Sequence, residues 1–191
     1  MTITDDQIIN QILAGDTYAY RQLVERYKDL VFTLALRMLK HREEAEEVAQ
    51  DAFVKVYRSL HKFKGDSKFS TWIYKVTYNT CLDKIKMNKK YCNDVAIDEF
   101  TFNKLDAIDN ALQHMIDTER HDLVKQCVNK LPSEDAYILT LFYFEELTLD
   151  EIAEIIEITS NTIKVRLFRA RKKLATILER YFEPETLVQK H

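Results

Sequence analysis

Lysine and aromatic side chains are mixed in the segment from Phe63 to Tyr78, whose aromatic members are Phe63, Phe69, Trp72, Tyr74 and Tyr78. Single-stranded DNA requires cations for its phosphates and aromatic faces on which unpaired bases stack. On a helix after this loop, four side chains fall roughly on one face: Trp72, Lys75, Asn79 and Lys86. The segment indicates a single-strand binding surface. Helical aromatics more often belong to a core, and for Trp72 both interpretations stay open.

A second candidate surface lies near the carboxyl end, where a short connection joins two amphipathic helices. Thr148 and Glu151 form a capping-box pattern ahead of Ile152, and residues 157–159 separate that helix from one predicted over about 160–181. This spacing is typical of a helix-turn-helix, whose second helix enters the major groove with its amino-terminal turn. Its predicted core face is Ile163, Leu167, Ala170, Leu174 and Ile177.

The remaining side chains of this last helix are predicted to project away from the core: Asn161, Thr162, Lys164, Val165, Phe168, Arg169 and Lys172. Hydrogen-bonding side chains in the first turn suit base edges, and arginine suits guanine. The basic residues Arg171, Lys172 and Lys173 suit phosphates, which orient a protein without specifying sequence. A solvated basic helix in a helical interaction domain is the alternative.

The net charge of −3 hides a division along the chain. Residues 52–90 hold ten basic side chains and two acidic ones, a net charge of +8, and residues 159–180 have a net charge of +6. Between them, residues 92–122 have a net charge of −6. Two basic blocks around an acidic one indicate two surfaces for a polyanion, with ordinary solvated helix faces as the alternative.

Acidic side chains also gather at the start of the predicted third helix: Glu43, Glu44, Glu46, Glu47 and Asp51. Acids near a helix amino terminus interact favourably with the helix dipole, which is a purely local explanation. The same acids, beside a basic region, also suit a docking face for a basic partner. Both interpretations stay open.

The composition predicts an all-α fold, because only two glycines and two prolines occur in 191 residues. Four helices are expected in a first domain over residues 1–90, followed by an acidic linker over 91–118 that includes a helical piece near 105–116. A second small helical domain over 119–183 would contain the helix-turn-helix, with Ser133 capping one of its helices.

Other kinds of site find little support in the sequence. Cys81, Cys92 and Cys127 match no metal or redox spacing and are expected to be buried or incidental thiols, and the five histidines form no ligand pair. We expect no cofactor, no metal and no small-molecule substrate, and find no arrangement typical of an enzyme. The absence of a membrane-length apolar run and of a signal-peptide pattern favours the cytoplasm and no membrane insertion.

Two stretches together resemble a known family. Residues 42–86, REEAEEVAQDAFVKVYRSLHKFKGDSKFSTWIYKVTYNTCLDKIK, resemble the second conserved region of the extracytoplasmic-function sigma factors of bacterial RNA polymerase. Residues 131–174, LPSEDAYILTLFYFEELTLDEIAEIIEITSNTIKVRLFRARKKL, resemble their fourth region. With the amino-terminal helices, the resemblance covers nearly the whole chain outside the linker. It implies a factor that directs promoter recognition, promoter melting and transcription initiation.

The resemblance also implies site residues. Core polymerase, with its β′ and β subunits, would be the partner, and Glu44, Glu47, Gln50 and Asp51 would bind the coiled coil of the β′ subunit. The −10 element, with one base flipped out of the stack, would be held by Lys64, Asp66, Ser67, Lys68, Trp72, Lys75 and Asn79. The −35 duplex would be read by Thr159, Ser160, Asn161, Thr162, Lys164, Val165, Phe168 and Arg169.

Two further expectations follow from the resemblance. An anti-sigma factor would hold the protein inactive, and the acidic linker would thread the polymerase's RNA exit path. Family members often carry Pro or Val and Gly where this chain has Thr159, Ser160 and Asn161, so no base preference can be transferred. A stand-alone helix-turn-helix regulator is the competing interpretation, although no coiled-coil heptads are present to form its dimer.

Overall fold

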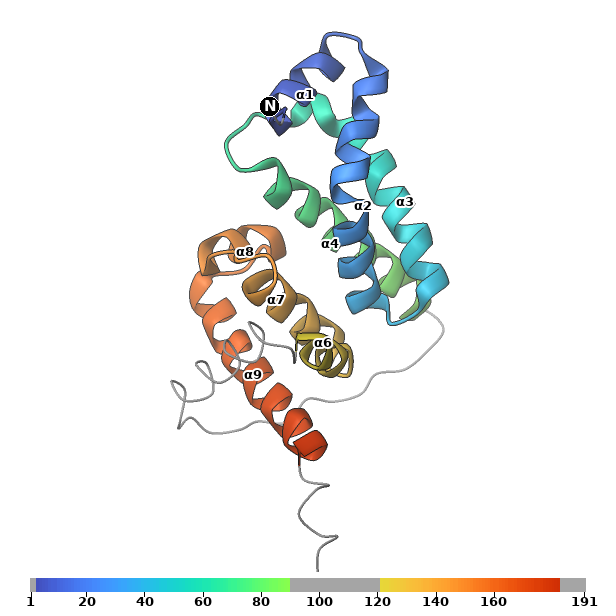
Figure 1. Ribbon diagram of the computed structural model, residues 1–191. Helices are drawn as coiled ribbons and strands as arrows, with labels where there is room; N and C mark the ends of the chain where they lie inside the picture. The colour runs from blue at the N-terminus through green and yellow to red at the C-terminus, as the bar shows by residue number, and fades with distance from the viewer. Residues whose placement is uncertain (1–2, 90–120, 183–191) are drawn as a thin grey trace, which may run out of the picture. The chain divides into compact units, whose positions relative to one another are not determined.

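The computed structural model describes residues 3–89 and 121–182, and every regular element in those ranges is a helix (Figure 1). Contacts divide the chain into two compact units. The first extends to residue 93, and the second holds α6, α7, α9 and most of α8. The predicted all-α fold is confirmed. The predicted linker and its helical piece lie outside the described residues.

The N-terminal unit is built from four α-helices and two short 3₁₀ turns. Its elements are α1 (Asp5–Leu13), η1 (Thr17–Ala19), α2 (Tyr20–Leu39), α3 (Arg42–Ser59), η2 (Leu60–Lys62) and α4 (Phe69–Lys89). Thr4 and Gln7 form a capping box at the start of α1, and the Asp16 side chain accepts hydrogen bonds from the amides of Tyr18 and Ala19 in η1. The four predicted helices are therefore present, and side-chain capping marks the starts of α1 and η1.

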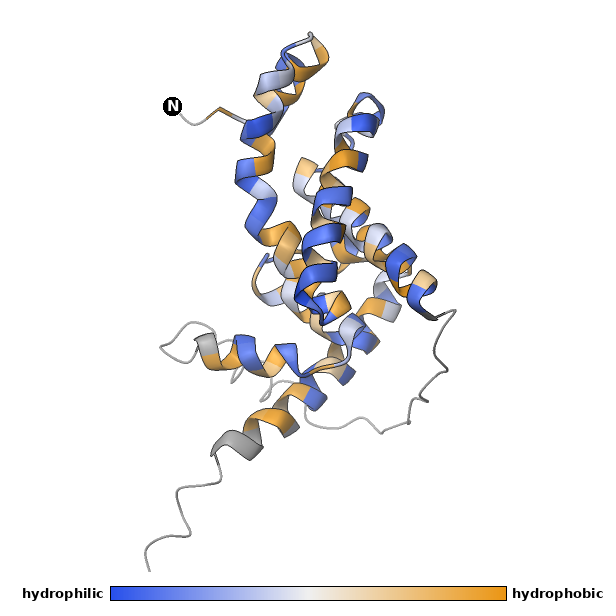
Figure 2. Cartoon of the chain, turned by 90° about the vertical axis from the view of Figure 1, so that its right-hand side faces the viewer, coloured by the Kyte–Doolittle hydropathy of each residue, from blue (hydrophilic) through white to orange (hydrophobic). Residues whose placement is uncertain are grey.

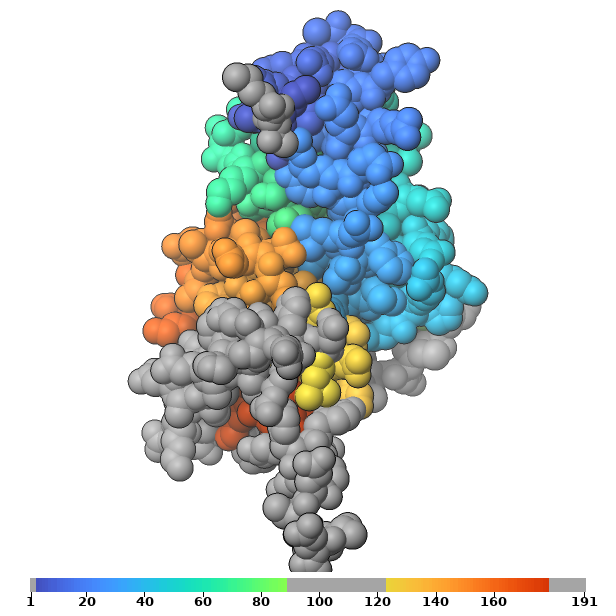
Figure 3. Space-filling model, viewed as in Figure 1, coloured from blue at the N-terminus to red at the C-terminus, as the bar shows by residue number. Residues whose placement is uncertain are grey.

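The core of this unit lies where α2, α3 and α4 pack against one another. Leu34 of α2, Ala45 and Val56 of α3 and Ile73 of α4 are each completely buried. Apolar residues recur every three or four positions, so each helix turns one apolar face inward, and the hydropathy colouring shows that alternation along the ribbons (Figure 2). The surfaces of α2 and α3 lie side by side in the space-filling view (Figure 3).

Asp5 attaches the first helix to the second. One carboxylate oxygen pairs with the guanidinium of Arg26, and the other accepts a 2.5 Å hydrogen bond from the hydroxyl of Tyr27. Burial, together with this bond to Asp5, raises the pKa of the Tyr27 phenol. Burial also raises the pKa of Tyr20, whose hydroxyl donates to the carbonyl of Phe53 at 2.6 Å. Both tyrosines hold their protons more tightly when folded.

Those raised pKa values predict alkaline destabilisation. A phenol whose pKa is higher folded than unfolded contributes stability below its ordinary value of about 10 and loses it as pH rises above that value. We expect the free energy of unfolding to fall by about 1–2 kcal/mol per tyrosine between pH 9 and about pH 11.5. Urea titrations at each pH should show a shallower decline for Tyr27→Phe, whereas Tyr18→Phe, at a 91% exposed position, should match the parent chain. Equal slopes for all three would contradict the assignment.

The C-terminal unit contains α6 (His121–Asn129), α7 (Ser133–Tyr143), most of α8 (Leu149–Ile156) and α9 (Ser160–Phe182). Its core includes Tyr137 and Leu139 of α7, Ile152 of α8 and Ile163 of α9. The prediction that Ser133 caps α7 is wrong: Pro132 is the N-cap, no side chain caps the helix, and Ser133 is its first residue. Ile177 is only half-buried, because Leu178 takes the inward position at that level of α9.

Candidate nucleic-acid and partner interface

Three aromatic rings meet where the loop after η2 enters α4. Phe63, Phe69 and Trp72 lie with ring centroids 5.4–5.7 Å apart, within the usual range for aromatic pairs. Phe69 is buried, with Tyr27 packed edge-on against it at 5.5 Å, whereas Trp72 is half-buried. The indole of Trp72 therefore packs on two phenyl rings and keeps part of its surface accessible.

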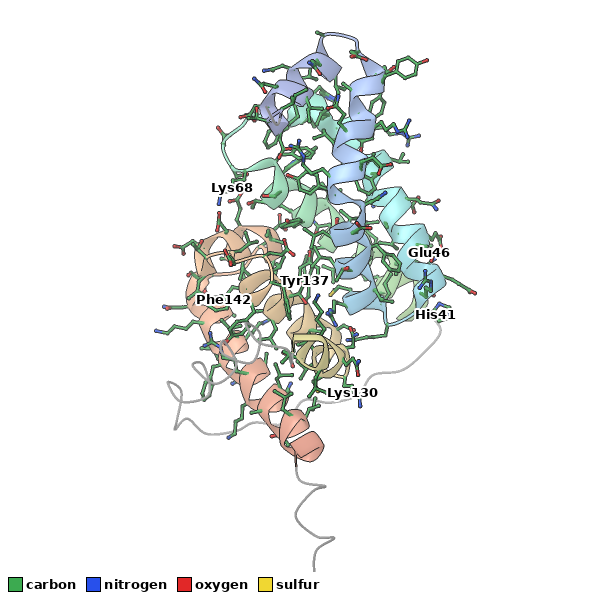
Figure 4. The ribbon with its side chains drawn as sticks, viewed as in Figure 1. His41, Glu46, Lys68, Lys130, Tyr137 and Phe142 are labelled. Atoms are coloured by element: carbon green, nitrogen blue, oxygen red, sulfur yellow. The ribbon has the colours of Figure 1, made fainter. Side chains whose placement is uncertain are left out.

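The loop places polar and charged side chains beside this aromatic cluster. Gly65 adopts a left-handed conformation, with φ of 78°, which turns the chain toward α4. The side chains of Lys64, Asp66 and Lys68 are exposed and Ser67 is half-buried; Lys68 is labelled ahead of α4 in Figure 4.

On α4 the side chains of the predicted DNA-binding face are more exposed than the tyrosines of the same helix. Asn79 is exposed and Lys75 is half-buried, whereas Tyr74 and Tyr78 are buried and belong to the core. The predicted −10 residues, Lys64, Asp66, Ser67, Lys68, Trp72, Lys75 and Asn79, therefore occupy the loop and one side of α4, and each keeps accessible surface.

The acidic residues of α3 form the second candidate surface. Glu47, Gln50 and Asp51 are exposed and Glu44 is half-buried; Glu46, on the same helix, is labelled in Figure 4. Two members of this set have hydrogen-bonding partners on α4: Lys84 for Glu47, at 2.6 Å, and Asn88 for Glu44, at 3.0 Å. The hydrogen bond to Glu47 raises the pKa of Lys84, and the charges of Glu47, Glu44 and Asp51 add to that effect.

A helix-turn-helix is formed by α8 and α9. Thr148 and Glu151 make the predicted capping box: each amide donates to the other residue's side chain, at 2.9 and 3.2 Å. Glu157 turns the chain between the helices with a left-handed φ of 62°. The hydroxyl of Thr159 then accepts a hydrogen bond from the amide of Thr162 at 3.3 Å and so caps the start of α9. These local interactions set where α9 begins.

The first turn of α9 exposes hydrogen-bonding side chains. Asn161, Thr162 and Lys164 are exposed there, and Arg169 is exposed about two turns further on. Thr159 is exposed as well, while Ser160 and Val165 are half-buried. The hydroxyls of Thr159 and Thr162 lie 2.8 Å apart, so capping and base contact would compete for them.

Two predictions for α9 are wrong. Phe168 is 6% exposed and does not project into solvent, because removing a phenyl ring from water is strongly favourable. Arg171, assigned above to phosphate, is buried: its Nε donates to the hydroxyl of Tyr143 at 2.7 Å and its guanidinium lies 5.1 Å from the centroid of Phe142. Arginine allows this because its planar group stacks on aromatic faces and its stem is apolar.

Two further basic side chains of α9 are paired within the unit. Arg166 lies 2.8 Å from Glu134, and Lys173 lies 2.7 Å from Asp135. Both acids belong to the first turn of α7, where the helix dipole favours them. Periodicity reveals which side of a helix is polar, but an ion pair between residues more than 30 positions apart leaves no mark in the sequence.

The described residues, 3–89 and 121–182, also bear on metal, thiol and membrane chemistry. No group of three histidine, cysteine, aspartate or glutamate side chains in this part of the chain is placed to hold a metal ion. Cys81 and Cys127 are buried thiols, as predicted, and burial raises the pKa of Cys81 to about 12; Cys92 lies outside the described residues. None of the described helices is long and apolar enough to span a membrane.

The fold and these surfaces define a two-part helical protein with a helix-turn-helix. The Sigma-70 region 2 model matches residues 23–91, and the Sigma-70 region 4 model matches residues 121–174. The chain is 34% identical over 172 residues to the ECF RNA polymerase sigma factor SigW of Bacillus subtilis, an alignment that covers 87% of this chain and 92% of SigW. It is 32% identical to the RNA polymerase sigma-H factor of Pseudomonas aeruginosa, covering 92% and 94% of the two chains.

Solved structures agree in fold. The structure of CnrH in complex with the cytosolic domain of CnrY matches with a TM-score of 0.61 at 20% identity, covering 91% of this chain and 96% of that one. The chain belongs to the extracytoplasmic-function RNA polymerase sigma factors, within the sigma-70 family. Its role is in transcription initiation, and the alternative of a stand-alone regulator is not favoured.

Proposed function

We propose that the N-terminal unit carries both the polymerase-docking surface and the −10 surface of this sigma factor. Exposed acids on α3, namely Glu47 and Asp51 with Glu44 and Gln50, would bind a basic segment of core RNA polymerase. The loop before α4, with Trp72, Lys75 and Asn79, would hold the melted −10 strand. The protein would supply binding energy and orientation, without catalytic chemistry of its own, in the cytoplasm, where the polymerase acts.

The observation that carries this proposal is the position of Trp72. Its ring is packed on Phe63 and Phe69 yet remains partly accessible, and exposed lysines lie in the preceding loop. A rigid, partly exposed aromatic face beside cations is the arrangement that stacks an unpaired base and neutralises its phosphates. Base–aromatic stacking contributes about 1–3 kcal/mol per base, which is comparable to the cost of taking one base out of the duplex.

For the C-terminal unit we propose −35 duplex recognition by α9. The exposed first turn, with Asn161, Thr162 and Lys164, would enter the major groove, and Arg169 would contact DNA about two turns further on. Thr159, Ser160 and Val165 would lie beside that contact. Phe168 is withdrawn from direct base reading because it is buried.

We also propose that an anti-sigma factor binds this protein and holds it inactive, as the family resemblance implies. A structure of similar fold, at 20% identity and a TM-score of 0.61, is that of the sigma factor RpoE with the anti-sigma factor NepR from Bartonella quintana. Affinity purification from lysate should recover such a protein; recovery of polymerase subunits alone would count against it.

The experiment for the −10 surface is a promoter-melting assay with core polymerase. In Trp72→Ala, loss of the stacking face should lower open-complex formation about tenfold, measured with a fluorescent base analogue in the −10 strand. Core binding and binding of −35 duplex should stay at parental values, because neither uses this ring.

Tyr18→Ala provides the matched control, since Tyr18 is an aromatic residue of the same unit and is 91% exposed. A pre-melted promoter distinguishes stacking from misfolding: Trp72→Ala should bind core normally and still bind the open strand more weakly. Parental melting by Trp72→Ala would refute the assignment.

A further inference from the structure

Two residues near the carboxyl end of α4 contact the acids of α3. Lys84 Nζ lies 2.6 Å from Glu47 Oε2, and Asn88 Nδ2 donates to Glu44 Oε1 at 3.0 Å. Glu44 and Glu47 are three residues apart, hence neighbours on one helix face. Half of the four residues proposed to bind polymerase are therefore already bonded by α4 in the free protein.

The exposure of the paired side chains is unequal. The side chain of Lys84 is 21% exposed, whereas that of Glu47 is 59% exposed. A carboxylate offers about four lone-pair positions on its two oxygens, so one ammonium does not saturate it. Lys84 thus holds Glu47 from the α4 side while much of the carboxylate stays open to an incoming cation.

We propose that Lys84 and Asn88 are positioning residues that hold the carboxylates of Glu47 and Glu44 in the orientation that core polymerase binds. The proposal rests on the polymerase-docking function proposed above for α3. Its physical basis is preorganisation: ordering a long side chain at an interface has an entropic cost on binding, and a side chain already held by its neighbours avoids part of that cost.

The same ion pair makes Lys84 less available to DNA, although Lys84 is one of the ten basic residues counted above in residues 52–90. A lysine whose ammonium is bonded to Glu47 would have to give up that partner to contact a phosphate. Lys55 is likewise paired, with Asp83 of α4 at 3.2 Å. That second α3–α4 ion pair involves none of the residues assigned to polymerase, so it offers a matched control.

The test measures the affinity of the full-length protein for sigma-free core polymerase at about 0.3 M salt, where long-range attraction is largely screened. Lys84→Met should weaken core binding about two- to fivefold, as expected for an exposed ion pair. Lys84→Arg, which keeps the pair, should bind like the parent. Lys55→Met breaks the control pair between the same helices and should leave core affinity unchanged.

A double-mutant comparison with Glu47→Gln decides whether Lys84 acts through Glu47. If it does, Lys84→Met has no further effect once Glu47 is Gln. An equal loss in both backgrounds, a loss in Lys55→Met as large as that in Lys84→Met, or parental affinity of Lys84→Met while Glu47→Gln binds weakly would each overturn the positioning role. Parental affinity of Glu47→Gln itself would refute the proposed docking surface, and the positioning role with it.

Discussion

Replacing Arg171 with alanine is expected to lower the free energy of unfolding of the C-terminal unit by about 2–4 kcal/mol. The change removes a hydrogen bond from a charged donor to Tyr143, ends the stacking on Phe142 and leaves a cavity at a position that is 9% exposed. A buried Tyr143 hydroxyl would also lose this partner. All of these contributions destabilise the folded state, so the expected loss of stability is large for a position that the sequence predicts to be exposed.

Urea unfolding followed by circular dichroism measures this loss. Trp72, the single tryptophan of the chain, lies in the N-terminal unit, so its fluorescence follows that unit separately. We expect the fluorescence midpoint of Arg171→Ala to equal that of the parent and the helical signal to shift. Parental stability in both signals would mean that the buried guanidinium is dispensable and that the contacts with Tyr143 and Phe142 contribute little.

Arg169→Ala is expected to have the opposite effect to Arg171→Ala: stability should hardly change, and DNA binding should weaken. Arg169 is exposed, so its removal should change stability by no more than about 0.5 kcal/mol. As the DNA contact of α9 proposed above, Arg169 should contribute about 1–3 kcal/mol to −35 binding, so that its removal lowers the affinity about five- to 150-fold. Duplex binding by the polymerase complex, measured by fluorescence anisotropy, tests this value.

The two arginines control for each other, since they lie two residues apart on one helix. If Arg169→Ala bound the −35 duplex with parental affinity, Arg169 would not be part of the DNA interface. A shallower salt dependence with a uniform loss over all −35 sequences would instead assign Arg169 to positioning on phosphate, whereas a loss confined to one base position would assign it to base reading.

Local chemistry explains why so much of the fold could be predicted. The capping boxes at Thr4 and Thr148 involve residues three positions apart, so a short stretch of sequence contains the whole interaction. The buried faces of α2 and α3 follow the same logic, because a helix repeats every 3.6 residues and its apolar side must turn inward. The predicted cap at Ser133 was wrong because the helix begins one residue earlier than expected, with Pro132 as its N-cap.

The surfaces were predictable only in part. The predicted −10 residues keep accessible surface, in agreement with the face of α4 that the sequence predicts. Asn161, Lys164 and Arg169 are exposed, as predicted for α9. Phe168 and Arg171 were misassigned because periodicity describes one helix in isolation, and their burial depends on the rest of the fold. The roles of these residues in binding remain predictions for the experiments above.

Sequence alone determined the helices, the capping box at Thr148, the helix-turn-helix spacing and the family of this protein, because each depends on residue types at short, regular separations. Tertiary structure alone decided which charges are available to a partner. Lys84, Arg166, Arg171 and Lys173 all count as basic residues in the sequence, yet each is held by a side chain 28 to 38 positions away. Charge is a property of a residue, whereas its availability depends on the neighbours that folding brings to it.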